Sequence, residues 1–206
     1  AQKVILDLRH CEEGWESSML CLLPYILDHP MSIAEMMEGQ GLLTHYTEKN
    51  CRRRIEQLEA MKSDPQLEPM ISEMIEELKA KAGLGWILET EADWGVDEEE
   101  LIHPVNAERR TVVILDFLTA GAAEELAELA SQSARCTLVG RMSSGRYQTC
   151  NLISVVFDDQ FQLDYPISRR KAWNKDQPRG VRCDIELAWT PQEWDEDLLM
   201  ETAKTV

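Results

Sequence analysis

The sequence is short of positive charge: 21 lysines and arginines stand against 38 aspartates and glutamates, a formal net charge of −17. A surface of that sign repels phosphate backbones, so nucleic acid is not expected as a partner. With 44% hydrophobic and 29% charged residues, the composition is otherwise typical of a globular protein. The 206 residues are enough for one sizeable domain with a core of its own.

Long apolar runs are also missing. No run approaches the roughly 18 apolar residues of a membrane-spanning helix, so no span is expected. No leader sequence precedes residues 4–8, Val-Ile-Leu-Asp-Leu, which have the pattern of a buried strand. A chain that begins on a core strand is expected to be a fragment of a longer one, and its missing targeting signal leaves the compartment open.

Paired cysteine motifs are absent as well. None of the six cysteines forms a Cys-x-x-Cys pair, and no set of residues has the spacing of zinc ligands. The sequence therefore predicts reduced thiols, no bound metal and no cofactor. Scattered free thiols favour a reducing compartment. The six are Cys11, Cys21, Cys51, Cys136, Cys150 and Cys183.

The apolar periodicity predicts strands that alternate with helices early in the chain, followed by a β-rich end. This order indicates an α/β domain with a mixed sheet. The last helix is expected to start at Thr190, where Pro191 suits the first helical position and Glu193 completes a capping box. The other predicted helices cover residues 16–28, 47–82 and 121–132, and the predicted strands cover 3–8, 84–90, 111–115, 136–139, 149–157, 160–167 and 183–188.

Two of these segments have special features. Residues 47–82 are predicted to be a helical hairpin, with a break at 63–65 and an apolar stripe over 67–78 in the second arm. That stripe either packs on the domain or serves as a docking surface for a partner. Residues 92–100 are strongly acidic and are expected to be a solvated loop or helix start.

Three stretches together resemble the tail-specific (C-terminal processing) serine peptidases and the related tricorn-type core domains. Residues 6–14 resemble the family's Leu-Asp-Leu-Arg strand and its glycine-rich turn. Residues 112–124 resemble the strand and helix start that carry the nucleophile, and residues 134–146 resemble an Ala-Thr-Leu-Val-Gly segment that ends in Gly-Lys. Weaker similarities follow at residues 180–185 and in the helix predicted from Thr190.

The resemblance implies a crotonase-like (ClpP-like) α/β fold, with a mixed sheet flanked by helices. It covers residues 3–28 and 106–206, so the expected organisation is a single peptidase-like domain over 1–206 with a helical insertion at 31–105. It also implies an extracytoplasmic compartment, which opposes the indication from the thiols. Peptides or unfolded polypeptides are the implied partners.

The residues that the family uses for hydrolysis are replaced at four positions. The nucleophile position holds Gly121, which has no side chain and cannot form an acyl-enzyme. The general-base position holds Arg146, and a guanidinium does not deprotonate near neutral pH. The acid position of the tricorn-type enzymes holds Gln177, and the oxyanion turn keeps Gly14 but carries Glu13 beside it. These departures predict that hydrolysis has been lost.

Other residues could still supply a catalytic group. Ser143 or Ser144 could be a relocated nucleophile, although two hydroxyls beside a glycine are commonly turn formers. His10 and His103 could act as bases, and Cys11 lies next to His10. Neighbouring side chains at a strand end point apart, however, which argues against that cysteine–histidine pair.

The sequence thus leaves three functions open. The leading hypothesis is a domain without hydrolytic activity that binds extended peptides along a sheet edge, with Arg146 holding a C-terminal carboxylate. The second is an active serine peptidase that uses Ser143 or Ser144. The third is a structural domain that forms homo-oligomers, with residues 67–78 as the interface.

Overall fold

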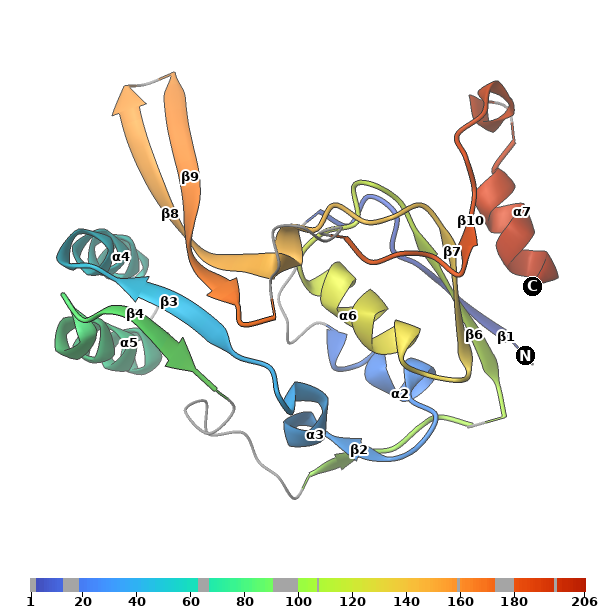
Figure 1. The fold of residues 1–206 in the computed structure, drawn as a ribbon, viewed down its shortest axis with the longest axis horizontal. Helices are drawn as coiled ribbons and strands as arrows, with labels where there is room; N and C mark the ends of the chain where they lie inside the picture. Colours follow the sequence, from blue (N-terminus) through green and yellow to red (C-terminus); the bar gives the residue numbers. More distant parts are fainter. Residues whose placement is uncertain are drawn as a thin grey trace. The chain divides into compact units, whose positions relative to one another are not determined.

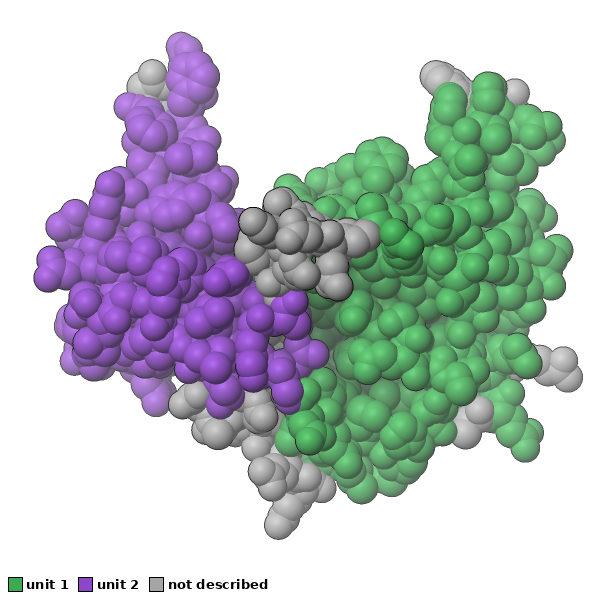
Figure 2. All heavy atoms as spheres, in the orientation of Figure 1, with its two compact units in different colours: residues 1–38, 96–148, 174–206 green, residues 39–95, 149–173 purple. Residues whose placement is uncertain are grey.

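The computed structural model describes residues 3–12, 19–62, 67–90, 100–106, 108–158, 160–172, 180–194 and 196–206. The chain forms two compact units, shown in two colours in Figure 2. Unit 1 comprises residues 1–38, 96–148 and 174–206. Unit 2 comprises residues 39–95 and 149–173, so the chain leaves unit 1 twice and returns to it twice.

Unit 1 is built on a parallel sheet of four strands, in the order β1-β6-β7-β10. Its core strand is β6, whose residues from Val112 to Leu115 are all buried. Alternate side chains of β6 enter different clusters: Val113 and Leu115 pack with α6, whereas Val112 and Ile114 pack with α7. Helices thus cover both faces, as a continuous apolar strand requires. The bounds are β1 (Lys3–Asp7), β6 (Arg110–Leu115), β7 (Cys136–Gly140), β10 (Ile185–Glu186), α6 (Ala122–Ser131) and α7 (Leu198–Thr205).

The helix predicted over residues 16–28 is wrong in extent. Within the described part of that range, the only multi-residue helix is α2 (Leu23–Ile26). Pro24 stands in its first turn, where a proline needs no N–H, but its ring would clash with the carbonyl four residues earlier if the helix continued backwards. Three further short elements of unit 1 were not predicted: β2 (Met31–Ser32), α3 (Ile33–Met37) and β5 (Leu101–Ile102).

The start predicted for the last helix is also wrong. Thr190 precedes a 3-10 turn (Pro191–Trp194), and α7 begins only at Leu198, where the side chain of Asp197 accepts a hydrogen bond from Met200 N. The Glu193 carboxylate does accept Thr190 N, as the capping box requires, but it also pairs with Arg141. Where Glu193 pairs with Arg141, the chain forms one 3-10 turn and not the start of a continuous helix.

Unit 2 is an antiparallel sheet of four strands, in the order β4-β3-β9-β8, with two helices packed against it (Figure 1). The predicted helical hairpin is confirmed as α4 and α5, and its break at 63–65 lies outside the described residues. β3 was not predicted. The bounds are β3 (Leu42–Tyr46), α4 (Glu48–Met61), α5 (Glu68–Lys81), β4 (Gly85–Glu89), β8 (Thr149–Asp158) and β9 (Phe161–Arg170).

The apolar stripe over residues 67–78 lies in the core of unit 2. Ile71, Ile75 and Leu78 are buried against Cys51 and Leu58 of α4. These three side chains are not available to a partner, whereas Leu67 and Met70 of the same stripe are exposed. Use of the stripe as an oligomer interface stays a prediction. Residues 31–105, predicted to be a helical insertion, also contain the strands β2 to β5. That this segment is an insertion within a single domain stays a prediction.

A buried carboxylate ties the sheet of unit 2 to α5. Glu89 accepts hydrogen bonds from Tyr46 Oη at 2.5 Å, Lys81 Nζ at 2.6 Å and Thr44 Oγ1 at 2.8 Å. Burial acts to raise the pKa of Glu89, but the bonds from Lys81, Tyr46 and Thr44 outweigh it and lower that pKa. Burial and the neighbouring Glu89 raise the pKa of Tyr46. The charged form of Glu89 is therefore the form that stabilises unit 2.

The hairpin of β8 and β9 extends beyond the rest of its sheet (Figure 1). β9 pairs with β3 only from Ser168 to Arg170, whereas β8 and β9 pair with each other along nearly their whole length. The outer half of the hairpin is therefore a ribbon of two strands. In the described ranges, no helix is both long and apolar enough to cross a membrane.

Candidate functional site

The carboxyl ends of β1, β6 and β7 bring the predicted site residues of unit 1 to the same end of its sheet. All three strands are parallel, and such ends are where open α/β sheets commonly bind ligands. His10 and Cys11 follow β1, Asp116 and Gly121 follow β6, and residues 141–147 follow β7.

The turn after β6 is fixed by its own side chains. Asp116 Oδ1 accepts the backbone N–H groups of Leu118 and Thr119, both at 3.0 Å. The buried Thr119 Oγ1 donates to Leu8 O at 3.0 Å and accepts Asp116 N at 3.0 Å. These bonds join the turn to the end of β1 and place Gly121 at the start of α6.

Gly121 has a backbone conformation that favours glycine, with φ 58° and ψ −127°. A Cβ atom built on it would find no atom of the described residues within 4 Å, so these residues leave open the space where a nucleophile would project. Its N–H donates to Glu124 Oε2 at 3.2 Å. The resemblance makes this the nucleophile position, and no side chain extends from it.

Glu124 is the centre of the hydrogen-bond network at this site, and it is completely buried. Its Oε1 accepts Ser143 Oγ and Gly145 N, both at 2.5 Å, and its Oε2 accepts Tyr147 N at 2.9 Å. The same Oε2 accepts Ser144 Oγ at 3.2 Å, in addition to Gly121 N. No cation pairs with it among the described residues, so five donors take the place of a counter-charge.

The two candidate serines are held by this carboxylate. Ser143 is buried, and its Oγ also accepts Val181 N at 2.7 Å, so its hydroxyl has a partner in both directions. Ser144 Oγ accepts Arg146 N at 3.3 Å while it donates to Glu124. A hydroxyl that is already donating to a carboxylate with five donors is poorly placed to attack a substrate.

Gly180 explains one of the weaker sequence similarities. A Cβ atom built on this glycine would lie 2.1 Å from Ser143 O, so the backbone there has room only for glycine. The close approach lets Ser143 N donate to Val181 O at 3.1 Å. This strand-like contact holds the 141–147 segment in place from its other side.

Arg146, at the general-base position, is exposed. Its Nη1 lies 3.8 Å from Glu12 Oε2, and the two side chains are 63% and 52% exposed, which makes the pair a weak surface contact. The predicted positions Glu13, Gly14 and Gln177 lie outside the described residues.

The histidines and the cysteine differ in their surroundings. His10 is exposed, and its Nε2 lies 3.3 Å from Asp116 Oδ2, so a buried carboxylate orients this ring. His103 is exposed in a loop. Burial, together with Asp7 and Asp116, raises the pKa of the Cys11 thiol, which disfavours a reactive thiolate.

Two residues of the site were missed by reasoning from sequence, Asp116 and Glu124. A signal existed for Asp116, because a polar residue that directly follows a buried strand lies at the ligand-binding end of a parallel sheet. Glu124 lies in the stretch 112–124 that carries the resemblance, and the sequence predicts no role of its own for it. Nothing in its helical spacing indicates that it is buried among hydroxyl and N–H donors.

Comparison with known proteins identifies the fold. The chain matches the structure of mature CPAF in complex with lactacystin at a TM-score of 0.58 and 12% identity, over 100% of this chain and 43% of that one. It matches a candidate peptidase from Parabacteroides merdae at a TM-score of 0.54 and 12% identity, over 100% of this chain and 51% of that one. The chain shares the fold of these two structures. The resemblance indicated by the three sequence stretches is thus confirmed at the level of the fold.

The same comparisons also limit what is shared. No model of a protein family matches the sequence, and no curated protein matches it. The chain spans about half or less of the length of the peptidases that it matches. Matches at 12% identity show that the fold is shared. The chemistry of this chain depends on its own residues.

Proposed function

We propose that this chain is a tail-specific-peptidase-like domain of the crotonase type that does not hydrolyse peptide bonds and binds extended polypeptide. The observation that carries the proposal is Gly121, at the start of α6, with open space where a nucleophile would project. Covalent catalysis needs an oxygen or sulfur atom at that point. The fold without that atom can still bind a substrate, because binding depends on backbone groups and surface charge.

Two further observations favour loss of hydrolysis. Arg146 stands where a lysine would have to give up its proton, and arginine keeps its charge at any physiological pH. The alternative nucleophiles Ser143 and Ser144 both donate to Glu124, which binds them as structural groups.

Arg146 is the group proposed to hold the end of a bound peptide. It is exposed at the ligand-binding end of the sheet, and its contact with Glu12 is long enough to be displaced. A guanidinium can bind a terminal carboxylate through two parallel hydrogen bonds. The outer strands of the unit 1 sheet, β1 and β10, offer edges along which the rest of an extended peptide could pair.

The first test is degradation of casein by the protein and by its Ser144→Ala and His10→Ala variants. We expect no cleavage by any of them. Cleavage that disappears in Ser144→Ala would mean a relocated serine nucleophile. Cleavage that disappears only in His10→Ala would place hydrolysis at the His10–Asp116 pair. Either outcome would overturn the proposal.

The second test measures binding. Fluorescence anisotropy with a labelled peptide, prepared with a free carboxylate and with a terminal amide, should show tighter binding of the free acid. Arg146→Ala should remove that difference, whereas Glu12→Gln, which removes the competing carboxylate, should preserve or strengthen it. Equal affinity of wild type and Arg146→Ala for the free acid would refute the role of this arginine.

A further inference from the structure

The β8–β9 hairpin of unit 2 has an apolar face that is covered at one end only. Register places Ile153 opposite Tyr165 and Val155 opposite Leu163, so all four lie on the same face. Ile153 is fully buried, whereas Leu163 is 50% exposed. Phe157 and Phe161, at the end of the hairpin, are 69% and 66% exposed. Arg53 and Asn50 of α4 hydrogen-bond Tyr165 Oη at the base of this face, and the face becomes exposed towards its end.

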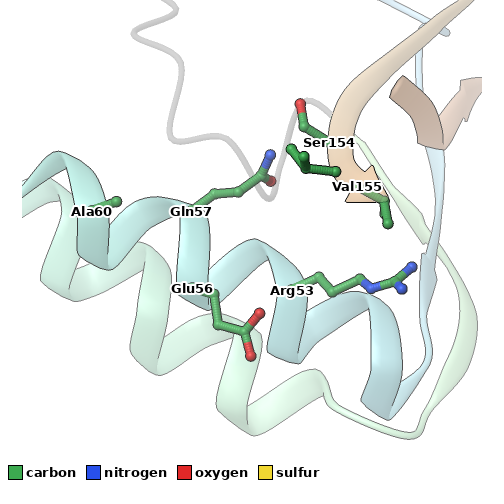
Figure 3. Close-up of a pocket in the computed structure, with 7 residues that line it drawn as sticks. Arg53, Glu56, Gln57, Ala60, Ser154 and Val155 are labelled. Carbon is green, nitrogen blue, oxygen red and sulfur yellow. The ribbon is translucent and has the colours of Figure 1, made fainter. Parts of the chain in front are cut away.

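A groove lies where the hairpin leaves α4 (Figure 3). It encloses about 420 Å³ and is lined by one side of α4 and by three consecutive residues of β8. Side chains alternate along a strand, so three consecutive residues can line one groove only if the groove runs along the edge of the strand. The lining residues are Arg53, Glu56, Gln57, Ala60, Ser154, Val155 and Val156.

That edge carries unpaired backbone groups. β8 is the outer strand of its sheet, and the carbonyl of Leu152 accepts a hydrogen bond from Arg54, so it points away from β9. In an antiparallel ladder, alternate residues direct both backbone groups to the same side. The N–H and C=O groups of Ser154 and Val156 therefore point into the groove, beyond the reach of Arg54.

The helix beside the groove carries three consecutive arginines, Arg52, Arg53 and Arg54, of which Arg53 lines the groove together with Glu56. None of the three forms an ion pair with a carboxylate in the described ranges. Arg53 donates to Tyr165 Oη at 3.0 Å. Figure 3 shows the side chains of Arg53 and Gln57 extending from α4 towards β8. Gln57 Oε1 is buried and has no hydrogen-bond donor in the part of the chain that the structure describes.

We propose that this groove binds an extended polypeptide segment that pairs with the outer edge of β8 and carries apolar residues followed by acidic side chains. The segment would add a fifth strand antiparallel to β8, with its apolar side chains against Val155 and the phenylalanines at the end of the hairpin. Its acidic residues would lie at the base of the hairpin, against Arg52 and Arg53.

The observations favour this occupant over a membrane or a second copy of the chain. Lipid cannot pair with a strand edge, so the unpaired backbone groups of β8 favour a polypeptide over a membrane. Two copies of net charge −17 repel each other at long range, whereas at short range the arginines of α4 favour an acidic segment. Exposed edge strands and large apolar side chains recur at sites of strand addition. This groove lies in unit 2, and the proposal for it does not depend on the proposal that Arg146 of unit 1 binds the C-terminal carboxylate of a peptide.

The test is fluorescence anisotropy with the labelled peptide Val-Thr-Ile-Thr-Val-Glu-Glu, amidated at its end. Binding should weaken roughly tenfold in Arg52→Glu, which changes an exposed side chain that forms no hydrogen bond or ion pair with the described residues, and in Phe157→Ser. Arg182→Glu, which makes the same charge change on the surface of unit 1, should have no effect. Arg146→Ala should have none either, so this proposal and the previous one can fail separately.

Methylation of backbone nitrogens in the peptide separates strand addition from general apolar contact. Methylating one alternate set of N–H groups should weaken binding roughly tenfold, and methylating the other set should leave it unchanged, because only one set faces β8. Equal effects of the two sets, or equal affinity of a peptide that ends in Gln-Gln, would overturn the proposal.

Two further results would identify another occupant. Cosedimentation with vesicles of phosphatidylcholine and phosphatidylglycerol that is lost in Phe157→Ser would indicate a membrane surface. A dimer in sedimentation equilibrium that is lost in the same variant would indicate a second copy. Either result, together with no binding of the peptide, would overturn the proposal.

Discussion

Replacing Glu124 with glutamine tests whether the five-donor network exists in solution. Oε1 accepts two of the donors and Oε2 accepts three, so whichever oxygen becomes the amide nitrogen, at least two donors lose their acceptor. The two serine hydroxyls can rotate away. At least one backbone N–H, that of Gly145 or those of Gly121 and Tyr147, cannot rotate, and it would face an NH₂ group inside the core.

The expected loss follows from that arrangement. A buried donor without an acceptor costs about 1–3 kcal/mol, and the lost bonds were to a charged group, which roughly doubles their strength. Glu124→Gln should therefore reduce the free energy of unfolding by about 2–4 kcal/mol, allowing for some relaxation of the 141–147 segment. The protein keeps the same number of heavy atoms, so no cavity contributes to the loss.

Urea denaturation followed by circular dichroism gives the stability, and hydrogen exchange with mass spectrometry shows where the change occurs. Because the chain has two compact units, exchange of residues 141–147 reports on the site itself and is the more specific observable. Glu128→Gln is the matched control, because Glu128 is on the same helix and its carboxylate accepts one hydrogen bond from the described residues, from Tyr147 Oη at 3.3 Å. A Glu124→Gln variant within about 0.5 kcal/mol of wild type would refute the reasoning.

Two further predictions follow from pKa shifts. The folded state lowers the pKa of Glu89, so the stabilising effect of its charge should be complete above the unfolded value of 4.5 and lost as the pH falls through the folded pKa. The difference in unfolding free energy between wild type and Glu89→Gln should therefore shrink at low pH. A difference that stays constant with pH would count against this prediction. Burial, with Glu186 and Asp184, raises the pKa of Cys183 to about 12. This thiol should therefore resist iodoacetamide in the native protein at pH 8, while the exposed Cys21 is alkylated. Rapid labelling of Cys183 would contradict its burial.

Sequence patterns predicted the elements that local physics determines. The run from Val112 to Leu115 is apolar without alternation, which fits a strand covered on both faces, and β6 has that environment. The stripe of α5 predicted a packed helix, and Ile71 and Ile75 are buried as expected. The three peptidase-like stretches predicted which residues follow the strands of unit 1, because order along the chain is sufficient for that.

Other features depend on contacts that no local pattern contains. β3 pairs with β9 through residues such as Thr44 and Ser168, which are 124 positions apart. The division into two units follows from that pairing. Glu124 and Glu89 have the sequence context of exposed helix and strand residues, and only the folded chain brings donors to both carboxylates. The assignment of Gly14 to the oxyanion turn and of Gln177 to the acid position stays a prediction.

The interleaving of the two units has a consequence for synthesis. The sheet of unit 2 lacks β8 and β9 until the ribosome has passed residue 170, and the sheet of unit 1 lacks β10 until residue 186. The α4–α5 hairpin is local and can form early, but its core stays open towards the missing strands during translation. Neither unit can therefore be completed before most of the chain has been made, and truncation after residue 148 would leave both unfinished.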